Sequence, residues 1–312
     1  MGKLVLSLGI IVVGLSLGYT LQRLSSAKLL TLPISLDDLR KGLQKTALLF
    51  VLPLTVLGAI WIVDVRSLSI AALPLIGVGA ITLGGILAMG AAEVLRLEPR
   101  QTGALIPCGA FTNIGSIGAL ICYVYLGEKG FALVPIYKLF EELTYYSVGF
   151  PIAKYFSAMD ANQDAPGARL KALVSDPFIL VAVSSIVLGG ILNLSDLPRP
   201  EIFGMINAVF IPLGTGLLLV SIGLAMRLKN LRHHLNACAL VSLIKFAIVP
   251  FCATAVAWFI GYGRIDNGLP LKVVMILSSM PVAFNALIPP SIYDLDLDLA
   301  NACWFFTTSA LI

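Results

Sequence analysis

Long apolar segments recur along the whole chain, and short stretches with charged residues, proline or glycine separate them. About 20 consecutive apolar residues suffice for a helix to cross the hydrocarbon core of a bilayer. The pattern predicts an all-α polytopic membrane protein with ten transmembrane helices. The predicted spans lie near residues 4–22, 45–63, 69–92, 102–126, 131–153, 177–194, 203–226, 236–261, 268–292 and 297–312.

The first span, 4-LVLSLGIIVVGLSLGYTLQ-22, follows Lys3 and could be taken for a secretory signal. It is longer than a signal-peptide core, and no A-x-A cleavage site follows it. We therefore expect a retained first helix.

The two halves of the sequence resemble each other on either side of the polar stretch 155-YFSAMDANQDAPGARLKALVSD-176. The pairs are 9-GIIVVGLSLG-18 with 184-SSIVLGGILN-193, 50-FVLPLTVLG-58 with 210-FIPLGTGLL-218, and 107-PCGAFTNIGSIGAL-120 with 281-PVAFNALIPPSIYD-294. Five spans per half is an odd number, so the second half must be inverted in the membrane. The sequence predicts a first repeat over 1–155, a cytoplasmic linker over 156–176 and a second, inverted repeat over 177–312.

The segment 107-PCGAFTNIGSIGAL-120 places poor helix formers in the middle of span four, and its counterpart in span nine does the same. One interpretation is close helix packing through small residues. The other is a pair of discontinuous helices, which in secondary transporters meet at a midplane site. We favour the second, because an amide recurs in both breaks. The candidate substrate-binding residues are Thr112, Asn113, Ser116, Pro281 and Asn285.

Charged residues inside the spans are few. Lys138, Glu141 and Glu142 in span five are three and four positions apart, which predicts one shared helix face. A lone charge at mid-depth costs about 2.5–3.5 kcal/mol on insertion scales, so these residues need partners. Lys245 in span eight is the natural partner across the bundle. A structural ion pair and a role in proton coupling both stay open for this group.

Composition agrees with a membrane location, since 58% of the residues are hydrophobic and 12% are charged. Soluble domains have about 25% charged residues. The net charge of +4 reflects loop residues rather than a nucleic-acid surface. Lys and Arg concentrate in alternate loops, which predicts a cell membrane protein (plasma or inner membrane) with both termini outside. The richer, cytoplasmic side includes Arg23, Lys28, Arg40, Lys41, Arg96, Arg100, Lys154, Arg169 and Lys171.

Motifs for chemistry are missing from the sequence. It contains no phosphate-binding loop, no catalytic serine motif and no metal-ligand cluster, and the five cysteines are expected to be packing residues. We expect no enzyme, no metal and no cofactor other than a proton or Na⁺ as coupling ion. A membrane enzyme built on Asp294, Asp296 and Asp298 is a minor alternative, because a spacing of two suits no helix face.

The segments 105-LIPCGAFTNIGSIGAL-120 and 277-LSSMPVAFNALIPPSIYDLDLDLA-300 resemble the auxin efflux carrier family, which includes plant PIN-FORMED proteins and bacterial malate or malonate permeases. The resemblance covers essentially the whole chain, and the fold is similar to that of the bile acid sodium symporters. It implies scaffold and transport domains that are each built from both repeats, and an elevator-like motion. It also implies that Asn113 binds a substrate carboxylate, with Thr112 in place of the crossover proline of plant members.

The sequence therefore predicts a secondary carrier of a small organic anion such as a carboxylate, working as a uniporter or with protons. A sodium-coupled symporter of the bile acid type is the alternative within transport, and a sensor built on a transporter fold is an alternative outside it. The expected partners are the anion, the lipid bilayer and a second copy in a homodimer, with no nucleic acid.

Overall fold

The computed structural model describes residues 2–30, 33–62, 68–157, 177–195, 197–226 and 231–311, and every regular element in these ranges is helical. From residue 158 on, the predicted linker 156–176 lies outside the described residues. Five of the described helices are long and apolar enough to cross a membrane: Leu36–Ile60, Ile70–Val94, Ile114–Tyr137, Ile202–Leu224 and Leu235–Phe259. The chain is thus a helical multi-pass protein, while the ten-span 5+5 arrangement stays a prediction.

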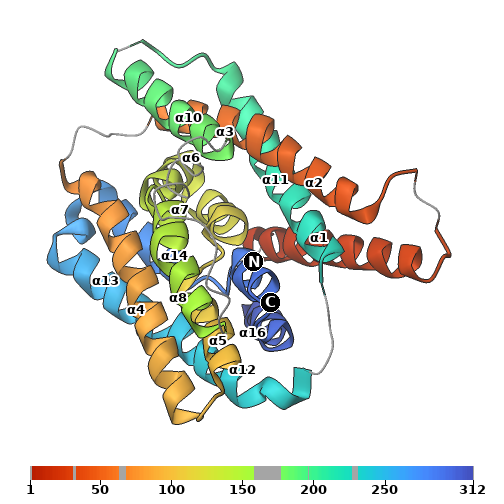
Figure 1. The fold of residues 1–312 in the computed structure, drawn as a ribbon. Coiled ribbons are helices and arrows are strands. Elements are labelled where there is room, and N and C mark those ends of the chain that lie inside the picture. Colours follow the sequence, from red (N-terminus) through yellow and green to blue (C-terminus); the bar gives the residue numbers. More distant parts are fainter. Residues whose placement is uncertain are drawn as a thin grey trace. The chain divides into compact units, whose positions relative to one another are not determined.

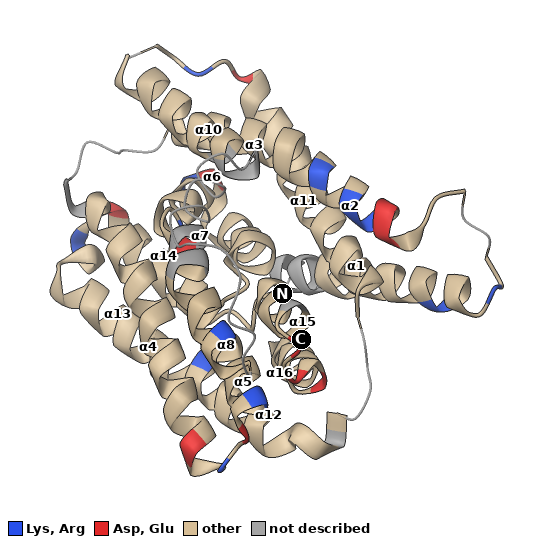
Figure 2. Ribbon diagram, in the orientation of Figure 1, with Lys and Arg blue, Asp and Glu red and all other residues tan. Residues whose placement is uncertain are grey.

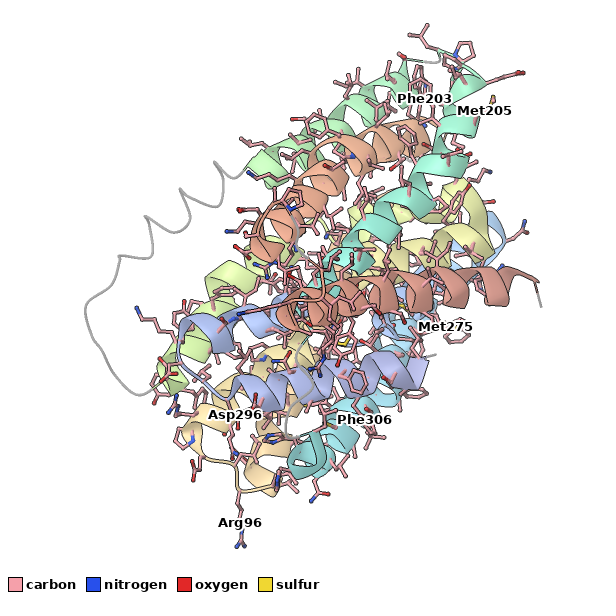
Figure 3. All side chains as sticks on the ribbon, turned by 90° about the vertical axis from the view of Figure 1, so that its right-hand side faces the viewer. Arg96, Phe203, Met205, Met275, Asp296 and Phe306 are labelled. Atoms are coloured by element: carbon pink, nitrogen blue, oxygen red, sulfur yellow. The ribbon has the colours of Figure 1, made fainter. Side chains whose placement is uncertain are left out.

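Large apolar side chains remain exposed on the helices, as lipid-facing surfaces require. Val94, Phe251 and Phe259 are 78%, 76% and 79% exposed. Met205, Met275 and Phe306 are exposed in the same way (Figure 3). Charged residues are sparse along the described helices (Figure 2). The apolar residues of the chain therefore divide between a packed interior and an apolar exterior.

The chain forms two compact units, and each draws segments from both halves of the sequence. Unit 1 comprises Met1–Ser67, Gly115–Pro135 and Pro177–Met226. Unit 2 comprises Leu68–Ile114, Ile136–Asp176 and Arg227–Ile312. The predicted repeats, 1–155 and 177–312, are a different division of the chain, and nothing in these units tests it.

In unit 1, α11 packs against α1, α2 and α3, and α10 packs against α3 (Figure 1). Glycines bring α1 and α11 into backbone contact, because a Cβ at Gly18 would lie 2.1 Å from the Val220 carbonyl oxygen. This is the small-residue packing typical of membrane helices. The helices of this unit are α1 (Gly2–Ser26), α2 (Leu36–Thr46), α3 (Leu52–Ile60), α6 (Ala119–Tyr137, whose last two residues fall in unit 2), α10 (Pro177–Leu194) and α11 (Ile202–Leu224).

In unit 2, α5 packs against α4, α8 and α16, and α13 packs against α14 and α4 (Figure 1). Helix α4 ends before Arg96, which has a left-handed φ of 51° and projects from the turn (Figure 3). Pro99 at the first turn and the Glu98–Gln101 capping box then start α5. The helices are α4 (Leu73–Val94), α5 (Pro99–Ala110), α7 (Glu141–Thr144), α8 (Phe150–Phe156), α12 (Leu235–Leu243), α13 (Val249–Phe259), α14 (Leu269–Ser278), α15 (Ile288–Ile292) and α16 (Leu297–Leu311).

Three π-helical turns stand just ahead of prolines. They cover Ala47–Val51, Tyr145–Gly149 and Ile244–Ile248, and a proline follows two positions later in each case, at 53, 151 and 250. A proline cannot donate to the carbonyl four residues back, and its ring crowds that carbonyl. Bonding to the fifth residue back relieves this conflict and places an extra residue in the turn.

Span five is not the continuous helix that the sequence predicted over 131–153. Helix α6 ends at Tyr137, a turn covers 138–140, and α7 begins at Glu141. Pro135 removes one backbone donor near this end, and the chain tightens through the bond from the Glu141 N–H to the Lys138 carbonyl oxygen at 2.9 Å. The assumption that Lys138 and Glu141 share the face of one helix was therefore wrong, although the two side chains do meet.

The contact of α4 with α5 holds the end of α5 in place and can be tested at two adjacent glycines. A Cβ at Gly84 would lie 2.2 Å from the Gly109 carbonyl oxygen, whereas one at Gly85 would lie 3.5 Å from the Ala110 Cβ. We expect Gly84→Ala to destabilise the protein by about 1–3 kcal/mol through overpacking. The matched control Gly85→Ala should be neutral or slightly stabilising. Thermal unfolding in detergent measures both, and equal melting temperatures would contradict the contact.

Candidate substrate site

Two helices of unit 2 are interrupted, and their extended segments bind each other. Helix α5 ends at Ala110 and Phe111 is already extended, while α14 ends at Ser278 and a short 3₁₀ helix begins at Phe284. Between them, Thr112 and Val282 form an antiparallel β-bridge. The Asn113 N–H donates to the Pro281 carbonyl oxygen at 2.9 Å, and the Ala283 N–H donates to the Phe111 carbonyl oxygen at 3.0 Å. The backbone groups that the interruptions free thus satisfy one another.

Side chains complete this hydrogen bonding. The Val282 N–H donates to the Thr307 hydroxyl of α16 at 3.2 Å, and the Thr112 N–H donates to the Tyr145 hydroxyl at 3.3 Å. Both donors are buried, where an unmet backbone group is costly. Neither Tyr145 nor Thr307 was among the site residues predicted from the sequence. Pro151 follows the π-helical turn that carries Tyr145, but prolines inside α5, α6 and α11 follow ordinary α-helix, so the sequence alone singled out neither hydroxyl.

Lys245 is buried against the first break, with 1% of its surface exposed. Its Nζ donates to the Thr112 hydroxyl oxygen at 2.7 Å and to the Ala110 carbonyl oxygen at 3.2 Å. The sequence predicted a glutamate partner for Lys245. Among the described side chains its partners are instead neutral oxygens at the end of α5, because the π-helical turn Ile244–Ile248 carries the lysine.

A second set of charges reaches the same break through Tyr145. The Tyr145 hydroxyl donates to Glu141 Oε1, and Glu141 Oε2 lies 3.2 Å from Lys138 Nζ. Glu141 is 4% exposed, so the predicted ion pair is a buried one on the glutamate side. The side chain of Glu142 lies outside the described residues. Lys245 thus contacts Thr112 directly, and Lys138 and Glu141 connect to it through the Tyr145 hydroxyl.

The Phe111 ring stacks on the Tyr145 ring, with centroids 3.7 Å apart. Gly149 makes room for it, since a Cβ there would lie 2.6 Å from the Phe111 ring. The two planes are 23° apart, so the rings lie nearly face to face. The stacked rings hold Tyr145 where its hydroxyl accepts the hydrogen bond of the Thr112 N–H.

The remaining predicted residues lie at or near the bridge. Asn113 and Pro281 are buried and joined by their backbones. Ser116 is buried in the π-helical turn Ile114–Gly118, within unit 1. Asn285 is half-buried in the 3₁₀ helix. In the antiparallel bridge Thr112 lies opposite Val282 and Asn113 lies opposite Pro281, whereas Asn285 lies three residues beyond Val282.

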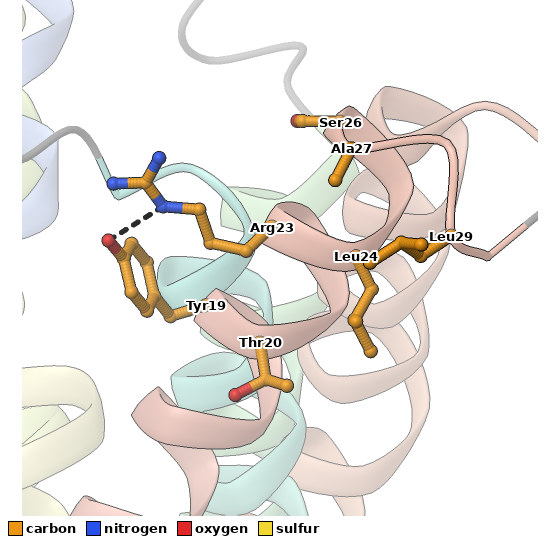
Figure 4. A pocket seen from close by; sticks show the side chains of 7 residues that line it. All are labelled: Tyr19, Thr20, Arg23, Leu24, Ser26, Ala27 and Leu29. Carbon is orange, nitrogen blue, oxygen red and sulfur yellow. Dashed lines mark hydrogen bonds between the residues drawn. The ribbon is translucent and has the colours of Figure 1, made fainter.

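Unit 1 carries a separate polar cluster and a small open pocket. Arg199 donates to Glu128 and, at 2.9 Å, to the Gly58 carbonyl oxygen, and the Asn207 amide lies 3.4 Å from Glu128. The pocket lies at the end of α1, where Arg23 Nε donates to the Tyr19 hydroxyl at 2.8 Å (Figure 4). Neither feature was predicted as a site. The Arg199 cluster ties helices of unit 1 together, whereas the residues that line the pocket all belong to α1 and the turn that follows it.

The described part of the chain holds no group of three His, Cys, Asp or Glu side chains placed to bind a metal. In the acidic run 294–298, Asp294 lies 2.6 Å from Arg100, and Asp296 accepts the Leu299 N–H at 2.9 Å. These carboxylates join the start of α5 to the start of α16. They therefore have a structural role in the part of the molecule described.

Paired helix interruptions in a multi-pass helical chain are typical of secondary membrane transporters. The family model described as membrane transport protein matches residues 10–312, so the chain belongs to that family. It is similar to an uncharacterized transporter of Methanothermobacter thermautotrophicus, 25% identical over 85% of this chain and 83% of the relative. It is also similar to an uncharacterized transporter of Methanocaldococcus jannaschii, 23% identical over 70% and 67% of the two chains. The predictions of a transporter family and of a protein that is not an enzyme are confirmed.

Tyr145 can be tested as the link between the break and Glu141. Tyr145→Phe keeps the stacked ring but leaves a carboxylate oxygen and the Thr112 N–H without this partner, and each such loss costs about 1–3 kcal/mol. We expect a clear fall in melting temperature in detergent. Tyr155→Phe is the matched control, because Tyr155 is 84% exposed. Equal melting temperatures for the two variants would show that the hydroxyl carries no such link.

Proposed function

We propose that the protein is a secondary carrier of a small organic anion such as a carboxylate. The observation that carries the proposal is the bridged pair of helix interruptions with a buried ammonium group at Thr112. Non-helical backbone at membrane depth persists only where protein or a water-filled cavity surrounds it. In transporters such breaks are where substrates bind. The Lys245 ammonium group at Thr112 favours an anion beside this break.

In this proposal Asn113 donates its side-chain amide to the carboxylate, with Thr112, Ser116, Pro281 and Asn285 around it. The helix that begins at Ile114 turns its N-terminal N–H groups toward the break, and such groups favour negative charge. The anion would be held by amide donors, a helix N-terminus and the field of Lys245, with no arginine involved.

Alternating access would come from an elevator-like motion in a 5+5 inverted repeat of ten spans, with both termini outside the cell membrane. Unit 2 contains both interruptions and the charged network, so we assign it the role of transport domain. Unit 1, held by glycine contacts and the Arg199 cluster, would be the scaffold. Transport would be uniport or proton-coupled, and a homodimer is compatible with this division of roles.

A sodium-coupled symporter of the bile acid type is the alternative. Its cation would need oxygens near the second break, and Ser278 and Ser279 are the nearest hydroxyls in the sequence. Both donate to carbonyl oxygens of their own helix, at 2.6 Å to Val274 and Met275 respectively. The sequence offers no aspartate or glutamate over residues 277–292 to join them, which favours the first proposal.

The function can be tested with purified protein in liposomes. We expect at least one of malonate, malate, lactate and benzoate to raise the melting temperature and to be taken up by the liposomes, because a ligand that binds only the folded state stabilises it. Putrescine, a cation of similar size, should do neither. Binding without uptake would point to a sensor, and no response to any anion would refute the proposal.

Asn113→Ala tests the site itself. A hydrogen bond to a charged group contributes about 1.5–3 kcal/mol, so its loss should weaken binding more than tenfold and abolish measurable binding of the stabilising anion. Asn236→Ala on the exposed face of α12 is the matched control. Isothermal titration measures both variants. Unchanged affinity in a folded Asn113→Ala protein would remove Asn113 from the site.

A further inference from the structure

The ammonium group of Lys245 has the surroundings of a bound metal cation. Its two partners among the described residues are oxygens, one a main-chain carbonyl at 3.2 Å and one a hydroxyl at 2.7 Å. Neither is a carboxylate. The Glu141 carboxylate is bound instead by Lys138 and by the Tyr145 hydroxyl. Lys245 is therefore not a member of the ion pair that the sequence suggested.

The carbonyl partner adds a second electrostatic reason for a cation at this point. Ala110 is the last residue of α5, so its oxygen lies at the negative end of the helix dipole. Unwound carbonyls and the C-terminal ends of half-helices are the groups that coordinate Na⁺ in transporters with broken helices. A lysine ammonium is a compact point charge with three donors, so it can take the place of such an ion.

The backbone around Lys245 is shaped to bring the ammonium to this position. The π-helical turn Ile244–Ile248 widens the helix at Lys245, and Pro250 enforces that turn. The side chain is then buried along its whole length, with 1% exposed, and ends at the break. Burial of an ammonium group is costly unless it is hydrogen-bonded, and the Ala110 carbonyl and Thr112 hydroxyl oxygens supply those bonds.

We infer that the Lys245 ammonium is a resident cation that takes the place of a coupling metal ion at the first helix break, so that transport proceeds without Na⁺ or K⁺. The inference rests on the proposed function and specifies its coupling. The ammonium neutralises the end of α5 in every step of the cycle and supplies the positive field for the anion. Removing it leaves the Ala110 carbonyl and the Thr112 hydroxyl as part of a monovalent-cation site.

The test compares wild type, Lys245→Ala and the control Lys272→Ala, whose lysine is exposed and bonds only the Asn267 carbonyl oxygen among the described residues. Each protein is measured in N-methylglucamine chloride, in NaCl, in KCl, and with added ethylammonium, which replaces the missing charge. Melting temperature and anion uptake are the two readouts. The melting temperature can be measured without any substrate.

Wild type and Lys272→Ala should respond alike in all four media. Lys245→Ala should lose uptake by about tenfold or more in N-methylglucamine chloride, as loss of charged hydrogen bonds predicts. Na⁺ or ethylammonium should restore part of the uptake and raise the melting temperature of this variant alone. A lysine with a purely structural role would give the loss without the cation-dependent recovery.

Three results would overturn the inference: wild-type uptake that requires Na⁺, full uptake by Lys245→Ala in N-methylglucamine chloride, or no recovery of that variant in any cation. If Lys245→Ala does not fold in any medium, wild-type uptake tests the inference, because that uptake should not depend on Na⁺. If wild type neither binds nor moves an anion in any medium, the proposed function fails. In that case the melting temperature of Lys245→Ala with and without Na⁺ still tests whether a cation binds at the first helix break.

Discussion

The need to satisfy backbone N–H and C=O groups away from water governs this structure. A helix satisfies its own groups, and each interruption in an apolar environment leaves several of them without partners. Here the two interruptions satisfy each other through the Thr112–Val282 bridge, and Tyr145 and Thr307 supply the remaining acceptors. The bridge therefore makes the broken helices possible and fixes where polar side chains can gather.

The long apolar segments predicted the helical membrane class, and the resemblance of residues 105–120 and 277–300 to a known family predicted a transporter. The sequence also singled out Thr112, Lys138, Glu141 and Lys245, which the structure connects in one network. Polar and charged residues are rare within apolar spans, so these residues could be recognised as candidates from the sequence. The network passes through Tyr145, whose hydroxyl looks like an ordinary packing group in the sequence.

The features that the sequence could not predict depend on which residues of two segments come to lie opposite each other. Asn113 and Asn285 each follow a proline within six residues, yet Asn113 comes directly after the bridged Thr112 whereas Asn285 lies three residues beyond Val282. Likewise the spacing of Lys138 and Glu141 suggested a continuous helix, whereas the chain turns after Tyr137. Such offsets of one or two residues arise from three-dimensional pairing and from π-helical turns. Pro151 and Pro250 are the sequence features that lie next to two of these π-helical turns.

The bridge also has a consequence for how the protein is made. Residues 111–113 leave the ribosome well before residues 281–283, which provide their backbone partners. Until the later segment arrives, water or another protein must cover the N–H groups of the first interruption. Insertion of the first half therefore yields an incomplete membrane protein, and the bridge between the two interruptions forms only after residues 281–283 have been synthesised. A chain arrested between these segments would be a substrate for membrane quality control.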